Sequence, residues 1–261
     1  MSIFVHEYVW LVFVLALFLT MMIFQEVGHV WGKRRLALDP HGTRAGAAAV
    51  EGAVFALLGL LVAFSFAGAA SRFEHRRDLI VDEANAVGTA YLRVNLLPGN
   101  YQIEMHQLFR NYLSTRLAAY DVLPDIKAAY AKYAEAEKIQ GEIWTKAVTG
   151  CREDPMPACS MNLLPALNTM FDIANTRRWV TQMHPPALIF LMLFFISVVC
   201  ALMAGFAMAK GKSRNWVYSI GFATVIAVTV YVILDLEYPR LGFLRVDKFD
   251  DALVQVLQGM K

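Results

Sequence analysis

The feature that most constrains this chain is a set of four long apolar stretches. Three of them carry no charge: Tyr8–Phe24, Pro186–Ala209 and Trp216–Leu234. The fourth, Ala45–Ala70, carries only Glu51. A helix of about 20 apolar residues crosses the hydrocarbon core of a bilayer. The sequence therefore predicts four transmembrane helices, with the lipid bilayer as their surroundings.

Composition supports a membrane protein and excludes one class of partner. Of the 261 residues, 57% are hydrophobic and only 18% are charged, which is too apolar for an ordinary soluble domain of this size. The formal net charge is only +2, whereas nucleic-acid binding needs a concentrated basic face, so no nucleic acid is expected as a partner. The polar stretches between the spans predict this division: spans one and two in 1–70, a helical extramembrane domain in 71–184, spans three and four in 185–234, and an extramembrane tail with a short helix in 235–261.

The polar insert is predicted to be helical, which makes the whole chain all-α. No window within it alternates like a strand, while Met105, Leu108, Phe109 and Tyr112 follow helical spacing. The second span measures about 39 Å as a helix, which exceeds a hydrocarbon core of about 30 Å. Because no proline interrupts the arginine-rich segment that follows, we expect this helix to leave the membrane and continue to Pro98.

Signatures of catalysis and of metal binding are poor. Glu26-x-x-His29 resembles half of a carboxylate-bridged metal site, but a second Glu-x-x-His on a facing helix is missing, and a solvated helix end is the commoner explanation. The sequence also contains no glycine-rich phosphate loop, zinc-ligand spacing or nucleophile elbow. We therefore expect no enzyme activity, no metal and no cofactor.

Two further patterns have alternative explanations. Cys151 and Cys159 flank a proline-containing loop and form either a small disulfide or two unpaired thiols. Two polar stripes at i, i+4, i+8 spacing either line a wet cavity or make structural hydrogen bonds across a helix pair. They consist of Asn85, Thr89 and Arg93, and of Asn168, Asp172 and Thr176.

The second span and its continuation resemble the bestrophin family of ion channels, in particular its bacterial branch. The shared residues are Phe64, Ala69, Arg72-Phe73 and Arg77, then Glu237-Tyr238-Pro239 after the last span and Asp251-Ala252-Leu253 in the tail. The whole chain is similar to a group of bacterial bestrophin-like membrane proteins, through EANAVGTAYLRVNLLP, LLPALN, HPP and YVILDLEYPR.

This resemblance implies a homopentamer in the bacterial inner membrane that conducts inorganic ions passively. Its central pore would be lined by the second span, with an apolar neck at positions that match Ala56, Leu60 and Phe64. The acidic run that binds calcium in the eukaryotic branch is missing, so no calcium site is expected. A non-conducting scaffold or sensor, whose helical domain binds a partner or small ligand, is the alternative function.

The orientation in the membrane has two conflicting predictions. The resemblance implies that both termini and the extramembrane domain lie in the cytoplasm. The charge that flanks the first span favours the reverse, because Lys33, Arg34 and Arg35 follow it while Glu7 precedes it. The side of the membrane on which the helical domain lies is left open by the sequence.

Overall fold

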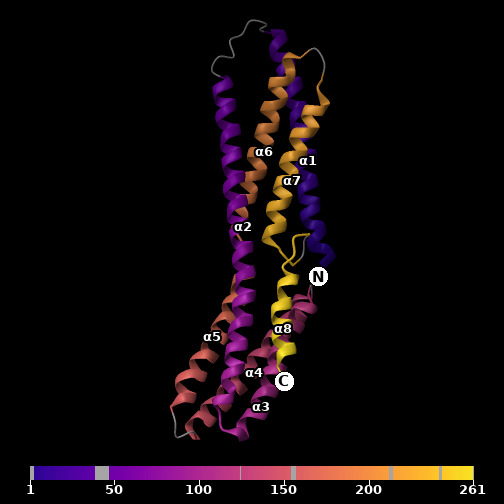
Figure 1. Ribbon diagram of the computed structural model, residues 1–261. Coiled ribbons are helices and arrows are strands. Elements are labelled where there is room, and N and C mark those ends of the chain that lie inside the picture. Colours follow the sequence, from indigo (N-terminus) through magenta and orange to yellow (C-terminus); the bar gives the residue numbers. More distant parts are fainter. Residues whose placement is uncertain are drawn as a thin grey trace. The chain divides into compact units, whose positions relative to one another are not determined.

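The protein is all-α, as the sequence predicts. The computed structural model describes residues 3–38, 47–123, 125–153, 157–211, 214–240 and 243–260, and no strand occurs within these ranges. The α-helices in chain order (Figure 1) are α1 (Ile3–Leu38), α2 (Ala47–Arg93), α3 (Gly99–Asp121), α4 (Ile126–Glu153), α5 (Ala158–Val180), α6 (Ala187–Ala207), α7 (Trp216–Glu237) and α8 (Asp251–Gly259). Short 3-10 helices are η1 (Val94–Leu96), η2 (Met208–Lys210) and η3 (Asp247–Asp250).

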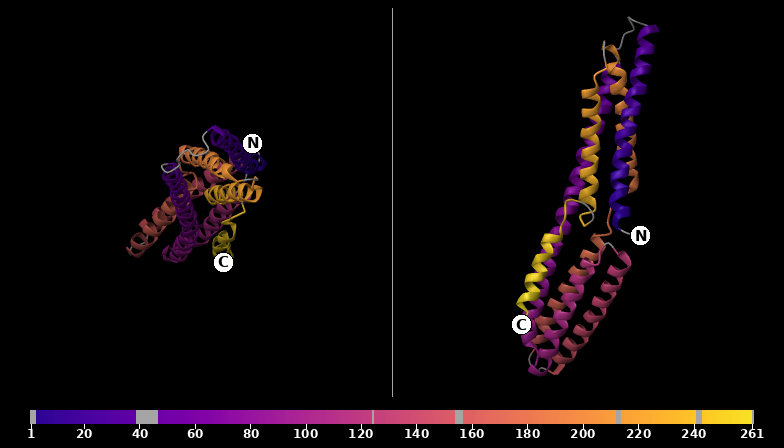
Figure 2. Two further views of the ribbon diagram at one scale, coloured as in Figure 1. Left: turned by 90° about the horizontal axis from the view of Figure 1, so that it is seen from above. Right: turned by 90° about the vertical axis from the view of Figure 1, so that its right-hand side faces the viewer.

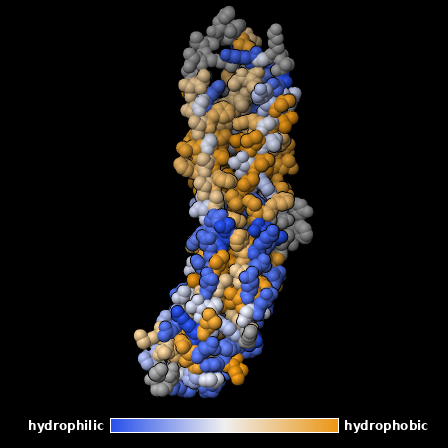
Figure 3. Space-filling view, viewed as in Figure 1, coloured by the Kyte–Doolittle hydropathy of each residue, from blue (hydrophilic) through white to orange (hydrophobic). Residues whose placement is uncertain are grey.

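Four of the described helices are long and apolar enough to cross a membrane, which confirms the predicted number of spans. They are α1, α2, α6 and α7. The chain also divides into two compact units. The membrane unit contains Phe4–Arg72 and His184–Tyr238, and the helical unit is built mainly from Phe73–Met183 and Pro239–Lys261. Figure 3 shows apolar side chains over the helices of the membrane unit and hydrophilic ones over those of the helical unit.

The second helix is continuous, as predicted. It runs over 47 residues from Ala47 to Arg93, and the turn η1 then leads to Pro98 at the start of α3. Ala45 and Gly46, which the sequence also assigns to this helix, lie outside the described residues. No proline occurs within α2, and alanine and leucine, which favour helices, dominate its first half. One helix therefore contributes to both units.

In the membrane unit, α1, α6 and α7 lie side by side (Figures 1 and 2). Their shared core consists of Leu17, Met21, Ala201, Ala223, Val230 and Leu234. Glycines allow α1 and α6 to touch: a Cβ on Gly28 would collide with the carbonyl of Leu202, and one on Gly205 would collide with the carbonyl of Gln25. Small residues are what permit such close helix contacts in membranes.

The helical unit packs α3, α4, α5, α8 and the second half of α2 around one core. The helical spacing predicted for α3 is confirmed, because Met105, Phe109 and Tyr112 are fully buried while Leu108 packs against the core at its edge. Fully buried partners from the other helices include Val87, Ile143, Leu163, Leu167 and Leu253.

A disulfide closes the connection between α4 and α5. Cys151, in the last turn of α4, is joined to Cys159 at the start of α5, and their Cα atoms are 5.3 Å apart. Both cysteines belong to the core of the helical unit. Cys200 is a buried free thiol in α6, and its Sγ lies 3.8 Å from the carbonyl oxygen of Val54.

Candidate functional site

The membrane-spanning part of α2 is the least enclosed of the four spans. In the most apolar 18-residue segment of α2, 11% is buried within the chain. The corresponding shares are 22% for α1, 22% for α6 and 33% for α7. A span with so few neighbours of its own presents most of its surface to lipid or to other chains. The exposed surface of α2 is therefore the best candidate for a site that forms when several copies of the chain assemble.

The residues expected at the neck share one exposed face of α2. Leu60 and Phe64 are 50% and 67% exposed, and Ala56, one turn earlier, is also exposed. The opposite face packs into the membrane unit, where Leu58 and Ala69 are buried. Ala56, Leu60 and Phe64 follow one another at intervals of four residues, so they form a single ridge along α2. This ridge points away from the other helices of the membrane unit.

The surface beside this ridge is unusually open. A Cβ added to Gly52 or to Gly59 would meet no described atom within 4 Å, in contrast to the glycines that hold α1 against α6. Small residues therefore line α2 where the chain itself supplies no partner. The arrangement combines two bulky apolar side chains with a smooth surface suited to close packing between helices.

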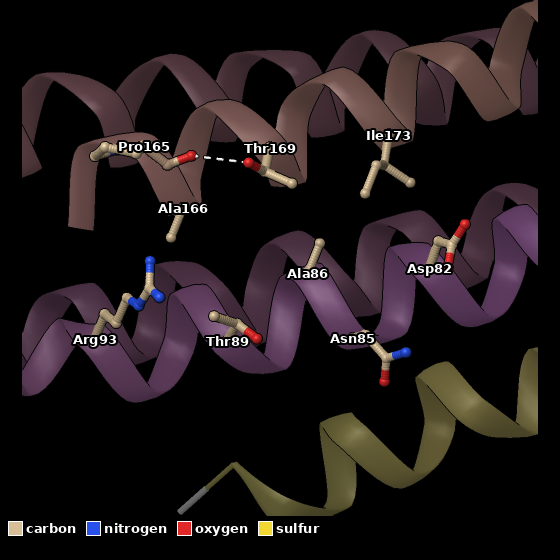
Figure 4. Close-up of a pocket in the computed structure, with 9 residues that line it drawn as sticks. All are labelled: Asp82, Asn85, Ala86, Thr89, Arg93, Pro165, Ala166, Thr169 and Ile173. Carbon is tan, nitrogen blue, oxygen red and sulfur yellow. Dashed lines mark hydrogen bonds between the residues drawn. The ribbon is translucent and has the colours of Figure 1, made fainter. Parts of the chain in front are cut away.

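The polar stripe on the second half of α2 lines a pocket in the helical unit. Asn85, Thr89 and Arg93, together with Asp82 and Ala86, form one wall of a cavity of about 400 Å³. The other wall comes from α5 and consists of Pro165, Ala166, Thr169 and Ile173 (Figure 4). Nη1 of Arg93 donates to the carbonyl oxygen of Asn162 at 2.9 Å, which connects the two walls at one end.

The predicted stripe on α5 does not line this pocket. Asn168, Asp172 and Thr176 are exposed, whereas Thr169 and Ile173, one position further along, face α2 (Figure 4). One residue turns a helix by about 100°. The structure therefore brings α2's stripe to the cavity and leaves α5's stripe on the surface beside it.

Sequence reasoning missed a buried ionic cluster in the helical unit. Glu83 is fully buried on α2, and its carboxylate accepts from Nε of Arg116 at 2.8 Å and from Nη1 of Arg177 at 2.6 Å. Burial alone would raise the pKa of Glu83, but the charges and hydrogen bonds of the two guanidinium groups outweigh it and hold the pKa below its usual value. Glu83 is therefore ionised at neutral pH.

The same cluster holds the tail that follows α7. Nη2 of Arg177 donates to Asp250 at 2.6 Å, and Arg240 contacts the same carboxylate at 2.9 Å. The ring of Tyr120 faces both guanidinium groups, with its centroid 4.3 Å from Arg177 and 4.1 Å from Arg240. Cation–π contacts and paired charges thus connect α2, α3, α5 and the tail.

A second buried acid lies at the end of α7 in the membrane unit. Glu237 is fully buried and accepts a hydrogen bond from Nε of Arg72 at 2.8 Å, while Nδ1 of His184 lies 3.9 Å from its other oxygen. The His184 ring stacks on Tyr238, at 4.4 Å between centroids. Arg72, one of the residues that carries the bestrophin resemblance, thus pairs with the glutamate of the Glu-x-Pro turn.

A sequence signal for the cluster around Glu83 exists in retrospect. Glu83 lies between Ile80 and Val87 on the buried face of α2, so a charge interrupts an otherwise apolar stripe. Arg116 stands three residues after Leu113 on α3 in the same way. A charged residue at an apolar phase of a helix indicates a buried partner of opposite charge.

Two acids of the tail, Asp247 and Asp250, are paired with arginines. Asp247 and Asp250 both contact Arg240, and within the described part of the chain no group of three or more His, Cys, Asp or Glu residues is arranged to hold a metal ion. Glu26 of the Glu-x-x-His pair lies 3.2 Å from Nε of Arg214. Asp247, Asp250 and Glu26 therefore serve as partners for guanidinium groups.

Taken with the fold, these features define a four-span, all-α integral membrane protein with a helical extramembrane unit. The chain belongs to the bestrophin-like family, because the model of the bestrophin-like domain matches residues 11–249. The resemblance read from α2 and the tail is thereby confirmed. No match to a curated protein was found.

Solved structures agree with this membership at the level of the fold. Three crystal structures of a bacterial bestrophin homolog from Klebsiella pneumoniae, each with a substitution, match with TM-scores of 0.69, 0.66 and 0.65. Sequence identity is 14%, 16% and 14%; the matches cover 96%, 95% and 94% of this chain and 97%, 98% and 98% of the other. At such identities the likeness establishes the fold alone.

Proposed function

We propose that this chain assembles into a homo-oligomer, a pentamer, whose central pore is lined by α2 and conducts inorganic ions passively. The observation that carries the proposal is the exposed apolar ridge of Ala56, Leu60 and Phe64 on the least enclosed span. Its support from outside the chain is membership of a family whose bestrophin members are ion channels.

Copies of α2 explain this surface better than lipid does. A lipid-facing helix gains nothing from glycine, whereas helices that meet one another benefit from small residues such as Gly52 and Gly59. Around a central axis, Leu60 and Phe64 would project inward as two apolar rings, and such rings restrict ions by dewetting. Ala56 would form a wider third ring, which makes the neck short.

The proposal assigns the helical unit to a vestibule and the chain to the bacterial inner membrane. In this arrangement the polar side chains of α2 and α5 would contact the ions before or after the neck. They are Asn85, Thr89, Arg93, Asn168, Asp172 and Thr176. An apolar neck gates without selecting by charge, so the ion preference would come from this vestibule.

One observation favours a second candidate function, a non-conducting sensor or scaffold. The cavity between α2 and α5 is large enough for a small ligand. A sensor would use the helical unit for recognition and the spans as an anchor. In that case Phe64 is a packing residue, and its loss would change stability or assembly without any current to alter.

The test is current across a planar bilayer that contains the purified full-length protein, under asymmetric salt. We expect discrete currents from the wild type and larger ones from Phe64→Ala, because the ring at this position widens. Phe66→Ala is the matched control: Phe66 is also exposed, but it lies about 200° round the helix from Phe64. Its currents should equal those of the wild type.

Either outcome is informative when assembly is checked by native mass spectrometry. Currents that respond to Phe64→Ala and not to Phe66→Ala support the pore, and their reversal potential gives the charge preference. Equal effects of Phe64→Ala and Phe66→Ala on the current would contradict the proposal that the ridge of Ala56, Leu60 and Phe64 lines the pore. Silence from all three proteins, each folded and oligomeric, would favour the sensor or scaffold.

A further inference from the structure

We propose that the pocket between α2 and α5 binds an extended zwitterionic small molecule about as long as a tripeptide, with its ammonium group at Asp82 and its carboxylate at Arg93. The cavity of about 400 Å³ lies within the range of small-molecule sites. This inference concerns the helical unit alone and does not rest on ion conduction.

The two charged residues stand at opposite ends of one wall. Asp82, Ala86, Thr89 and Arg93 follow i, i+4, i+7, i+11 spacing along α2, and the first and last are separated by about 16 Å of helix axis (Figure 4). Long side chains on a helix lean back towards its N-terminus, so the Arg93 guanidinium lies closer to Asp82 than the backbone does. The remaining distance suits an extended chain of three residues, about 10 Å long.

Both ends have unused capacity for a ligand. The Asp82 carboxylate is exposed and lies within hydrogen-bond or ion-pair distance of no other group among the described residues. Arg93 uses Nη1 to donate to the carbonyl of Asn162, which fixes the guanidinium against α5. A guanidinium has five N–H donors, and those that remain suit bidentate binding of a carboxylate.

The middle of the pocket is lined by small side chains, most of them apolar, with Thr89 and Thr169 among them. Ala86 and Ala166 form its buried floor, and neither has a side chain that would fill the space. Oγ1 of Thr169 donates to the carbonyl of Pro165 at 3.0 Å, so towards a ligand it can only accept. Thr89 belongs to the α2 wall, but its hydroxyl lies on the side away from α5, and Asn85 also points away from α5 (Figure 4).

This distribution of charge decides the class of ligand. A single inorganic ion could contact only one of the two charged ends at a time, and an apolar molecule would make no use of either. A molecule with an amine, an uncharged hydrogen-bonding centre and a carboxylate uses all three parts. Triglycine is the simplest probe of that description.

The experiment is isothermal titration calorimetry of the detergent-solubilised full-length protein with four probes. They are triglycine, N-acetyl-triglycine, triglycine amide and free glycine, each up to millimolar concentration. We expect saturable binding of triglycine, a loss of about tenfold or more on blocking either end, and weak binding of glycine, which is too short to reach both charges.

Variants then assign each end. Asp82→Asn should weaken triglycine binding, and this variant should bind triglycine and N-acetyl-triglycine with equal affinity. Arg93→Gln should also weaken triglycine binding, and it should bind triglycine and triglycine amide with equal affinity. Asp78→Asn is the control, because Asp78 is an exposed acid one turn earlier on α2 that does not line the pocket. Its titrations should match those of the wild type.

The proposal is overturned if the wild type shows no saturable binding, or if blocking either end leaves the affinity unchanged. It is also overturned if Asp82→Asn and Asp78→Asn have equal effects. If a variant fails to fold, as judged by size-exclusion chromatography, the affinities of the four probes for the wild type still show whether both charged ends of the ligand are needed. None of these results depends on current through a bilayer.

Discussion

Arg177 connects to Glu83 through a 2.6 Å hydrogen bond between two side chains that are almost completely buried. The two residues are 94 positions apart in sequence, on α5 and α2. Glu83 also pairs with Arg116 on α3, so one carboxylate holds three helices together. The two buried guanidinium groups therefore share the carboxylate of Glu83. Arg177 also pairs with Asp250.

Glu83→Gln is expected to destabilise the helical unit strongly. The amide keeps the size of the side chain but leaves Arg116 and Arg177 without their shared counter-charge, and breaking a buried pair in this way costs about 3–5 kcal/mol. Urea unfolding of the purified protein, followed by circular dichroism, measures the change.

Glu135→Gln is the control for that experiment. Glu135 pairs with Lys132 on the exposed side of α4, where an ion pair contributes about 1 kcal/mol or less. Equal destabilisation by the two changes would mean that the buried cluster contributes no more than a surface pair.

Acid should weaken the same interaction. Because the pKa of Glu83 in the folded protein is below its ordinary value of 4.5, the ionised carboxylate stabilises the fold above that pH. This contribution is lost as the pH falls through the lower pKa of the folded protein. The gap in free energy of unfolding between wild type and Glu83→Gln should be constant near neutral pH and narrow below pH 4.5. If the difference in free energy of unfolding instead widens in acid, the pKa of Glu83 is raised in the folded protein and this prediction is wrong.

Much of the fold could be predicted because the bilayer imposes it. A stretch such as Trp216–Leu234 has no alternative to a spanning helix, since its backbone must be satisfied internally in lipid. The continuity of α2 was predictable because no residue between Ala47 and Arg93 breaks a helix. The buried side of α3 followed from spacing alone, as the burial of Phe109 shows.

Side-chain partners across helices could not be predicted in the same way. Asn168 and Thr169 are neighbours in sequence, and the choice of which one faces α2 depends on how buried residues such as Leu167 and Met170 orient α5. The pairing of Glu83 with Arg177 depends on the same packing, because local spacing cannot match residues on separate helices. Family resemblance indicated the importance of Arg72 but not its partner Glu237.

Gly205→Ala should disrupt the membrane unit. Its new methyl group would collide with the backbone carbonyl of Gln25, which a flexible side chain cannot relieve, so α1 and α6 must separate. Gly221→Ala on α7 is the control, since a Cβ there meets no described atom within 4 Å. The yield of monodisperse protein and its thermal midpoint in detergent should fall for the first variant and stay level for the second. Equal behaviour would show that α1 and α6 do not rely on this contact.

The cysteines provide a test of stability that also bears on orientation. Of the three cysteines in the chain, Cys151 and Cys159 are bonded and Cys200 is free. Maleimide labelling in denaturant should therefore modify one thiol per chain before reduction and three after it. Cys151→Ser should lower the free energy of unfolding by about 2–3 kcal/mol, because it releases a short loop in the unfolded chain.

The labelling is most informative on protein taken directly from its native membrane under thiol-blocking conditions. Disulfides persist on the oxidising side of a bacterial membrane and are rare in the cytoplasm. One labelled thiol per chain would place the helical unit outside the cytoplasm, in agreement with the charges after the first span. Three labelled thiols would place it inside, as the family resemblance implies, and would mean that the Cys151–Cys159 bond forms only after the protein leaves the cell.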